Sequence, residues 1–209
     1  MTAGQPTAAV PPGRAGRMWL RRRLGSATRG REQLDRKLQV LLPEQRRLHA
    51  HAERCHREWD ETYDQARTWL LRASLLGGQD ALRRAEPSRD ATFEIVWDTV
   101  MGLRIPSDVS QHEPDESSLP ADNVAVPAAR AAYRSALEAA IRVAAADAAE
   151  RMLDDEVATC RRRLRALDRR WIPWLSEQLR VMQLALDDLE LDDGTRLRRA
   201  AALKGRDQR

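Results

Sequence analysis

The chain has 209 residues, of which 33% are charged, 42% are hydrophobic and only 4% are aromatic. Together with a mean hydropathy of -0.63, this balance argues against the thick three-layer core of an enzyme and favours long helices. All but two of the 36 basic residues are arginines, which suit carboxylate partners as well as phosphate. The two cysteines indicate a reducing compartment, and no apolar run reaches the roughly 18 to 20 residues of a membrane-spanning helix.

The N-terminal third of the chain carries a sustained helical repeat. Residues 1–16 are rich in Ala, Pro and Gly and are predicted to be a disordered tail. From Leu20 to Leu76, apolar residues recur in alternating steps of four and three, with only three polar interruptions. A repeat of about eight heptads is typical of a coiled-coil seam and exceeds an ordinary globular helix. Residues 17–77 are therefore predicted to form an N-terminal coiled-coil arm.

The next segment, 78–127, interrupts the helical pattern. Gly77–Gly78 ends the first arm, and five of the ten prolines fall within the segment. From Phe93 to Ile105, apolar residues lie at alternate positions, which predicts one strand that bends at Gly102. A weak return strand near 123–126 completes the predicted β-hairpin.

A second coiled-coil arm is predicted over 128–203, followed by a short tail at 204–209. Its first part carries a small-residue stripe that contains Tyr133, Leu137, Ile141, Ala144 and Ala148. The repeat sharpens from Leu153 onward and resumes at Leu175 after one extra residue, next to Pro173. Such a phase slip beside a proline predicts a local unwinding of the supercoil.

These elements predict a mainly α fold, in which the two arms form a long antiparallel two-helix coiled coil with a short β-hairpin and loop insertion between them. If the arms close near Leu76 and Ala128, facing positions sum to about 204, because both helices rise about 1.5 Å per residue. Cys160 then faces position 44, about 16 Å along the helix from Cys55. A disulfide reaches only about 7 Å, so both cysteines are predicted to be free thiols.

Residue patterns that carry out chemistry are scarce in this sequence. Neither common glycine-rich phosphate-binding motif is present. The densest group of potential metal ligands is His49, His51, Cys55 and His56, but helix spacing places only His51 and Cys55 on one face. No metal, cofactor or catalytic residue is therefore predicted. The basic run at 161–170 lacks the interleaved aromatic residues of a nucleic-acid-binding surface.

Three groups of residues resemble the motifs of a known family. The first is Pro12-x-Arg14 with Leu24, Ala27, Arg29-Gly30, Leu34 and Lys37. The second, and most specific, is Val100-Met101-Gly102-Leu103-Arg104-Ile105-Pro106. The third is Arg162-Arg163-Leu164, Ala166-Leu167, Ile172-Pro173 and Arg196-Leu197-Arg198-Arg199. Through these motifs the whole chain resembles the D subunits of the V-type and archaeal-type rotary ATPases.

The resemblance implies a central-stalk rotor subunit that transmits torque between ATP hydrolysis or synthesis in a catalytic hexamer and ion translocation by a membrane ring. It implies a non-catalytic, cytoplasmic protein that is held at the membrane only through the complex. The implied partners are the catalytic and nucleotide-binding subunits of the hexamer, a small companion stalk subunit, and a socket subunit on the membrane ring, with no nucleic acid.

The resemblance also places contact residues on the basic and apolar segments. We expect contact with the surrounding hexamer at Arg161, Arg162, Arg165, Arg169, Arg196, Arg198 and Arg199. We expect contact at the foot of the stalk at Phe93, Trp97, Met101 and Leu103. Two alternatives stay open. One is a standalone coiled-coil scaffold or adaptor, and the other is a basic nucleic-acid-binding rod whose affinity falls steeply with salt.

Overall fold

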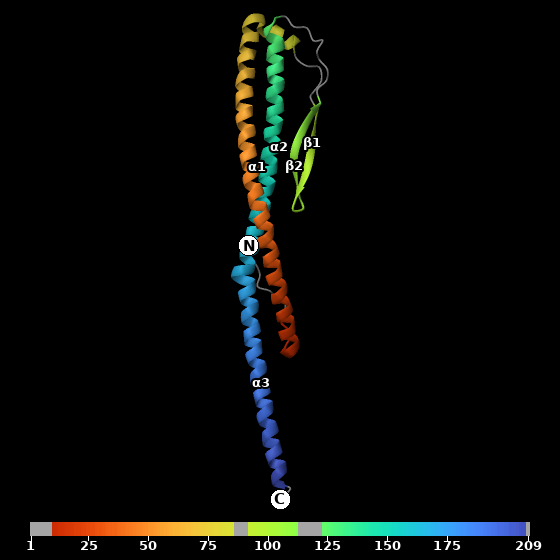
Figure 1. Cartoon of the computed structure of the whole chain (residues 1–209), viewed down its shortest axis with the longest axis vertical. Coiled ribbons are helices and arrows are strands. Elements are labelled where there is room, and N and C mark those ends of the chain that lie inside the picture. The colour runs from red at the N-terminus through yellow and green to blue at the C-terminus, as the bar shows by residue number, and fades with distance from the viewer. Residues whose placement is uncertain (1–9, 86–91, 113–122, 208–209) are drawn as a thin grey trace. The chain divides into compact units, whose positions relative to one another are not determined.

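The computed structural model describes residues 10–85, 92–112 and 123–207 (Figure 1). The elements follow the order α1 (Gly13–Arg84), β1 (Thr92–Val100), β2 (Leu103–His112), α2 (Ala125–Ala166), η1 (Leu167–Trp171) and α3 (Ile172–Asp207). The predicted fold class is therefore confirmed. An N-terminal helical arm, α1, and a C-terminal arm, formed by α2, η1 and α3, are separated in sequence by a β-hairpin.

The chain divides into two compact units, and each pairs a part of α1 with a part of the C-terminal arm. The hairpin unit is Lys37–Thr159, which contains β1, β2 and most of α2. The terminal unit is Met1–Arg36 together with Cys160–Arg209, which contains the start of α1, η1 and α3. No helix among the described residues carries an apolar stretch long enough to cross a bilayer.

In the hairpin unit, α1 and α2 lie side by side and antiparallel (Figure 1). Polar contacts join them from Lys37 with Glu156 to Glu58 with Arg142, so numbers rise on one helix as they fall on the other. The partner numbers sum to values from 193 to 203 along this unit. The predicted antiparallel pairing is therefore confirmed, and all of these sums lie below the predicted value of about 204.

The predicted seam on α1 is confirmed over almost its full length. Every seam position from Leu20 to Ala73 is buried or partly buried, and only the last one, Leu76, is exposed. The predicted helix break also occurs, because Gly78 has φ 63 and ψ -173, outside the helical region. Helical turns then resume to Arg84, since Ala81 is buried in a small core with Ala73, Ala125, Val126 and Ala129.

The first half of the second predicted seam is confirmed only in part, because Tyr133, Ile141 and Ala148 are partly buried. Leu137 is 42% exposed and Ala144 is also exposed. The buried positions are instead alanines, Ala129, Ala136, Ala139, Ala146 and Ala149. Small side chains allow close packing against α1, as where Ala146 meets Ala52 and Cys55, so the bulkier residues lie off the contact line. From Leu153 the predicted seam is confirmed through Val157 and Cys160.

The predicted phase slip in the second arm takes the form of a π-helical turn. The N–H of Ile172 donates to the carbonyl of Leu167, five residues earlier, and η1 spans the residues between. A π turn absorbs one extra residue in a helix, which matches the extra residue seen in the repeat beside Pro173. Within this turn, Trp171 is 39% exposed and contacts Trp174 edge to face, with 6.3 Å between the ring centres.

The β-hairpin differs from its prediction in topology. The predicted single strand folds back at Met101 and Gly102, so β1 pairs antiparallel with β2 from Thr92 with His112 to Val100 with Leu103. Both turn residues have positive φ, 49 and 82, as a two-residue hairpin turn requires, and glycine adopts this conformation without steric cost. The predicted return strand at 123–126 is wrong, because α2 begins at Ala125.

Other predicted boundaries shift when compared with the observed elements. The helix α1 begins at Gly13, inside the predicted tail, and α3 continues to Asp207. Residues 1–9 of that tail, and residues 86–91 and 113–122 of the insertion, lie outside the described residues. Both cysteines are free and buried, as predicted.

Candidate functional site

The hairpin presents large apolar side chains to solvent. Of the predicted stalk-foot residues, Phe93 is 58% exposed, and Trp97 and Met101 are nearly half exposed. Leu103 is partly buried. The Arg104 guanidinium lies 5.3 Å from the Trp97 ring centre, a cation–π distance. Exposed aromatic and methionine side chains on a small sheet are typical of a protein contact surface.

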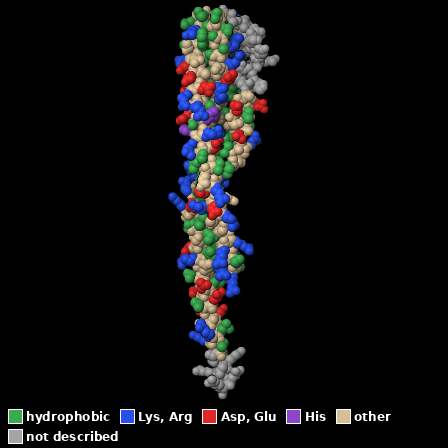
Figure 2. Space-filling view, in the orientation of Figure 1, with side chains coloured by type: hydrophobic (Ala, Val, Ile, Leu, Met, Phe, Trp, Pro, Cys, Tyr) green, Lys and Arg blue, Asp and Glu red, His purple; other side chains and the backbone are tan. Residues whose placement is uncertain are grey.

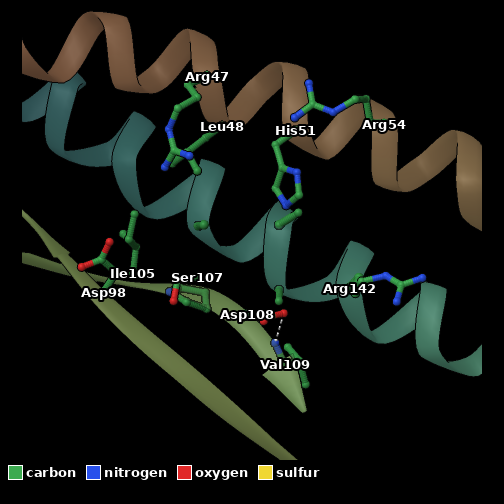
Figure 3. A pocket seen from close by; sticks show the side chains of 14 residues that line it. Arg47, Leu48, His51, Arg54, Asp98, Ile105, Ser107, Asp108, Val109 and Arg142 are labelled. Carbon is green, nitrogen blue, oxygen red and sulfur yellow. Dashed lines mark hydrogen bonds between the residues drawn. The ribbon is translucent and has the colours of Figure 1, made fainter. Parts of the chain in front are cut away.

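The hairpin is anchored to the helix pair by Ile105 and Pro106, which are both buried. The sequence predicted Ile105 only as a strand residue, because the alternating pattern did not distinguish it from the exposed Phe93 and Trp97. Between the hairpin and the two helices lies a cavity of about 330 Å³ (Figure 3). Its apolar lining includes Leu48 of α1 and the alanines of α2, among them Ala146.

The rim of this cavity mixes basic side chains from the helices with acidic ones from the hairpin. Arg47 and His51 of α1 line it, as do Asp98 and Asp108 of the hairpin. The Glu44 carboxylate accepts hydrogen bonds from Arg47 Nε at 2.9 and 3.0 Å. This contact raises the pKa of Arg47, with a smaller contribution from Asp98. The charges therefore favour docking of the hairpin on the helix pair.

A second apolar surface lies at the tip where α1 breaks and α2 begins. Leu75, two residues before Gly77, is 86% exposed, and Val124, one residue before α2, is 90% exposed. A side chain at Gly77 would collide with Asn123, whose Oδ1 accepts the N–H groups of the first two residues of α2 at 3.0 Å. This cap fixes where α2 starts. We define the tip patch as Leu71, Leu75, Leu76 and Val124.

The tip patch was not predicted from the sequence as a contact surface. Leu71 and Leu75 lie off the predicted seam, and Leu76 is its last position. The heptad repeat identifies seam residues and gives no information about exposed residues outside the seam. A usable signal was present, because Leu75-Leu76 stands directly before Gly77-Gly78. Adjacent leucines cannot both face the same seam.

The predicted arginine contacts of the second arm are all exposed. Arg161, Arg162 and Arg165 lie at the end of α2, and Arg169 lies in η1. Asp168, the only acid within the run, accepts a hydrogen bond from Arg31 Nε of α1 at 2.7 Å, and this contact raises the pKa of Arg31. In the view of Figure 2, basic side chains are spread along the visible surface and are not gathered in one patch.

The remaining predicted arginines lie on the last turns of α3 and are also exposed. Arg196 is 3.8 Å from Asp193, and Arg198 donates to the Gly194 carbonyl at 3.1 Å. The ion pair between Arg14 and Glu190, at 3.0 Å, joins α1 to α3. Beyond Glu190 no described side chain of α3 is buried. This end of α3 therefore lacks a covering helix within the described chain.

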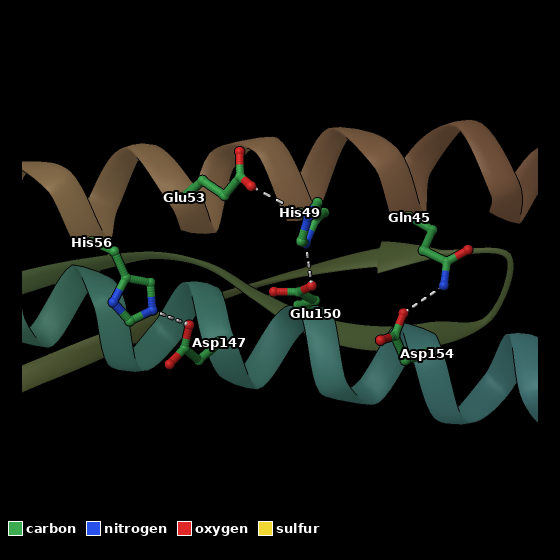
Figure 4. Close-up of polar contacts among 7 residues, drawn as sticks. All are labelled: Gln45, His49, Glu53, His56, Asp147, Glu150 and Asp154. Carbon is green, nitrogen blue, oxygen red and sulfur yellow. Dashed lines mark hydrogen bonds and ion pairs between the residues drawn. The ribbon is translucent and has the colours of Figure 1, made fainter.

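Two of the three histidines considered as potential metal ligands face carboxylates of the opposite helix (Figure 4). His49 Nδ1 lies 2.7 Å from Glu150 Oε1, and His56 Nε2 lies 2.9 Å from Asp147 Oδ1. The ring of His51 instead contacts the Cys55 sulfur at 3.7 Å, on the shared face that spacing predicted. Among the described residues, no three potential ligands are arranged to hold a metal ion. Burial raises the pKa of the Cys55 thiol.

The fold and these surfaces define a class of protein. It is a helical coiled-coil protein with paired antiparallel arms, an intervening β-hairpin, and exposed surfaces suited to contact with other proteins. The family model for the ATP synthase D subunit matches residues 18–202. Because this match covers most of the chain, the protein belongs to the ATP synthase D-subunit family.

Individual relatives agree with this membership. The D subunit of the V-type ATP synthase of Thermotoga neapolitana is 30% identical over 196 residues, covering 91% of this chain and 96% of that protein. The D subunit of the A-type ATP synthase of Archaeoglobus fulgidus is 27% identical, covering 95% and 99%. The D subunit of the V-type ATP synthase of Thermus thermophilus is 28% identical, covering 91% and 86%.

Proposed function

We propose that this chain is the central-stalk rotor subunit of a V/A-type rotary ATPase or ATP synthase. In this role it transmits torque between ATP hydrolysis or synthesis in a catalytic hexamer and ion translocation by a membrane ring. The observation that carries the proposal is the D-subunit family match over residues 18–202, and the antiparallel pairing of the two arms supports it.

The structure of the hairpin unit is physically suited to transmitting torque. A single helix resists twisting only through its own backbone. Two helices packed along a seam resist twisting more strongly, because twisting them also disrupts the packing of their side chains. In this unit the seam on α1 runs from Leu38 to Ala73, and polar contacts flank it. Close-packed interiors resist deformation. In this proposal the chain is non-catalytic, needs no cofactor of its own, and leaves ATP chemistry to the hexamer.

The terminal unit supplies the surface proposed to contact the catalytic and nucleotide-binding subunits. The end of α3 beyond Glu190 carries exposed leucines, including Leu191 and Leu197, beside the exposed Arg196, Arg198 and Arg199. Arginine pairs with carboxylates in fixed planar geometry, so these side chains suit an acidic inner wall. The arginines at 161, 162, 165 and 169 extend this surface along α2 and η1.

The hairpin and the tip patch supply the proposed contacts at the foot of the stalk. Phe93, Trp97, Met101 and Leu103 are proposed to contact the small companion subunit and the socket subunit on the membrane ring. The tip patch joins them, because it exposes apolar side chains beside the helix break. Through these contacts the chain is held at the membrane indirectly, from the cytoplasmic side, without spanning the bilayer.

Co-purification from native membranes tests this proposal. We expect the tagged chain to be recovered with a nucleotide-binding hexamer and a membrane ring. A complex assembled without the chain should hydrolyse ATP with no accompanying ion transport, since nothing links the two rings. Recovery of the chain alone, as a scaffold, or together with nucleic acid in a salt-sensitive manner contradicts the rotor assignment.

A further inference from the structure

One edge of the interface between α1 and α2 carries a row of acidic side chains. On α2 these are Asp147, Glu150 and Asp154, spaced three and four residues apart and therefore on one face of the helix. The facing residues on α1 are Gln45, His49 and His56 (Figure 4). Gln45 Nε2 donates to Asp154 Oδ1 at 2.6 Å. His49 Nδ1 lies 2.7 Å from Glu150 Oε1, and His56 Nε2 lies 2.9 Å from Asp147 Oδ1.

The choice of partners for this row is unusual in an arginine-rich chain. The protein has 36 lysines and arginines but only four histidines, and three of those histidines lie between 49 and 56. Permanent cations pair across the same interface at its two ends, Lys37 with Glu156 and Arg142 with Glu58. Between those ends, the described contacts of the acidic row are with an amide and two imidazoles.

We propose that this histidine–carboxylate row is a pH-sensitive clasp that holds α1 to α2 more firmly in mildly acidic than in alkaline solution. When the His49 imidazole is protonated, its hydrogen bond with Glu150 is charge-assisted. When it is neutral, three carboxylates at helical spacing repel one another without the opposing imidazolium of His49 on α1. The clasp does not depend on the proposed rotor function.

The electrostatic surroundings of His49 agree with this direction. Glu150 of α2 raises the pKa of His49, with smaller contributions from Glu53 of its own helix and from Asp154. A histidine whose pKa is higher in the folded than in the unfolded chain stabilises the folded chain. That stabilisation is fully present below the ordinary histidine value of about 6.5, and it is lost as the pH rises through the raised pKa.

The third histidine of the segment has a different environment and provides a matched control. The ring of His51 contacts the Cys55 sulfur, and His51 lines the cavity together with Arg47, Arg54 and Arg142. The acidic side chains that line this cavity, Asp98 and Asp108, come from the hairpin. A change at His51 therefore alters a histidine on the same helix without touching the acidic row.

Thermal unfolding of the full chain between pH 5.5 and 8.5 tests the clasp. The double variant His49→Gln, His56→Gln keeps hydrogen-bonding side chains but cannot become charged. We expect its Tm to lie about 2 to 4 °C below wild type at pH 5.5 and to approach the wild-type value at pH 8.5. The variant His51→Gln should show no such pH-dependent difference. A gap independent of pH, no gap, or the same trend in His51→Gln overturns the proposal.

A local measurement separates the clasp from general stability. Cys55 is buried in the seam between α1 and α2 beside this row, so a thiol reagent reaches it only when the arms open there. In a Cys160→Ser background, we expect the double variant to be labelled roughly three to five times faster than its parent at pH 6. The rates should be equal at pH 8.5, and comparison at one pH cancels the intrinsic pH dependence of the thiol. Equal rates at both pH values contradict the clasp.

Discussion

The hairpin unit and the end of α3 differ in whether their apolar side chains are buried. In the hairpin unit, α1 and α2 cover each other through buried alanines and flanking polar contacts. Beyond Glu190, α3 exposes leucines at 191 and 197 and has no buried described side chain. The first region therefore supplies internal cohesion. The second exposes apolar and basic side chains that another protein can contact.

Matched leucine truncations give the largest expected difference between these regions. Leu153 is fully buried in the hairpin unit, so Leu153→Ala should lower the free energy of unfolding by about 2 to 5 kcal/mol. Leu197 is largely exposed, so Leu197→Ala should change it by less than about 0.5 kcal/mol. Urea unfolding of both variants measures this. An equal loss of unfolding free energy in both variants would show that Leu197 is buried within the chain, and it would contradict the difference between the two regions.

Charge reversal of the terminal-unit arginines should weaken function without weakening the fold. We expect the triple variant Arg161→Glu, Arg165→Glu, Arg169→Glu to lower ATP-driven ion transport about tenfold, because acidic side chains cannot pair with an acidic wall. Its circular dichroism and Tm should stay near wild type. The exposed Arg67 of the hairpin unit provides the control, and Arg67→Glu should leave transport unchanged. Unchanged transport in the triple variant contradicts the proposed sleeve contact.

Removing the cap of α2 tests the cohesion of the hairpin unit at its tip. Asn123→Ala deletes the oxygen that accepts two backbone N–H groups and should cost about 1 kcal/mol of unfolding free energy. Asn123→Asp keeps an acceptor and should recover most of that loss. Denaturant titration of the two variants is the measurement, and a full loss in Asn123→Asp would contradict a capping role.

An exposed pair on α3 gives the smallest expected effect. The Arg180 guanidinium donates to Glu177 at 2.7 and 3.0 Å and lowers the pKa of that carboxyl group. Stabilisation from a lowered pKa is present above the unfolded value of about 4.3 and is lost as the pH falls through the folded value. Arg180→Gln should therefore lower Tm by less than about 2 °C at pH 7 and leave it unchanged at pH 3. If Arg180→Gln lowers Tm more at pH 3 than at pH 7, the expected pH dependence of this ion pair is wrong.

The local sequence pattern was sufficient to predict the features that depend on a single helix. The seam on α1, the break at Gly78 and the phase slip before Pro173 were all visible in the spacing of residues. Each follows from helix periodicity or from the conformational range of glycine and proline. The free thiols of Cys55 and Cys160 also followed, because the predicted antiparallel register placed them far apart.

Features that depend on two surfaces meeting were decided by the tertiary structure. The sequence placed Leu137 and Ala144 on the predicted seam, but in the structure the buried residues nearby are Ala136 and Ala146. Sequence predicted one strand through Gly102, but the positive φ at Met101 and Gly102 folded it into two. The pairing of His49 and His56 with carboxylates of α2 required the interhelical register, which no single-helix pattern contains.

The amino-acid sequence by itself therefore determined that this protein is two long helical arms around a small insertion, because heptad spacing is a property of the chain. The tertiary structure decided which stripe of α2 is buried, how the hairpin folds, and which histidines meet acids. These depend on the volume and charge that one element presents to another, and such quantities exist only once the elements are packed.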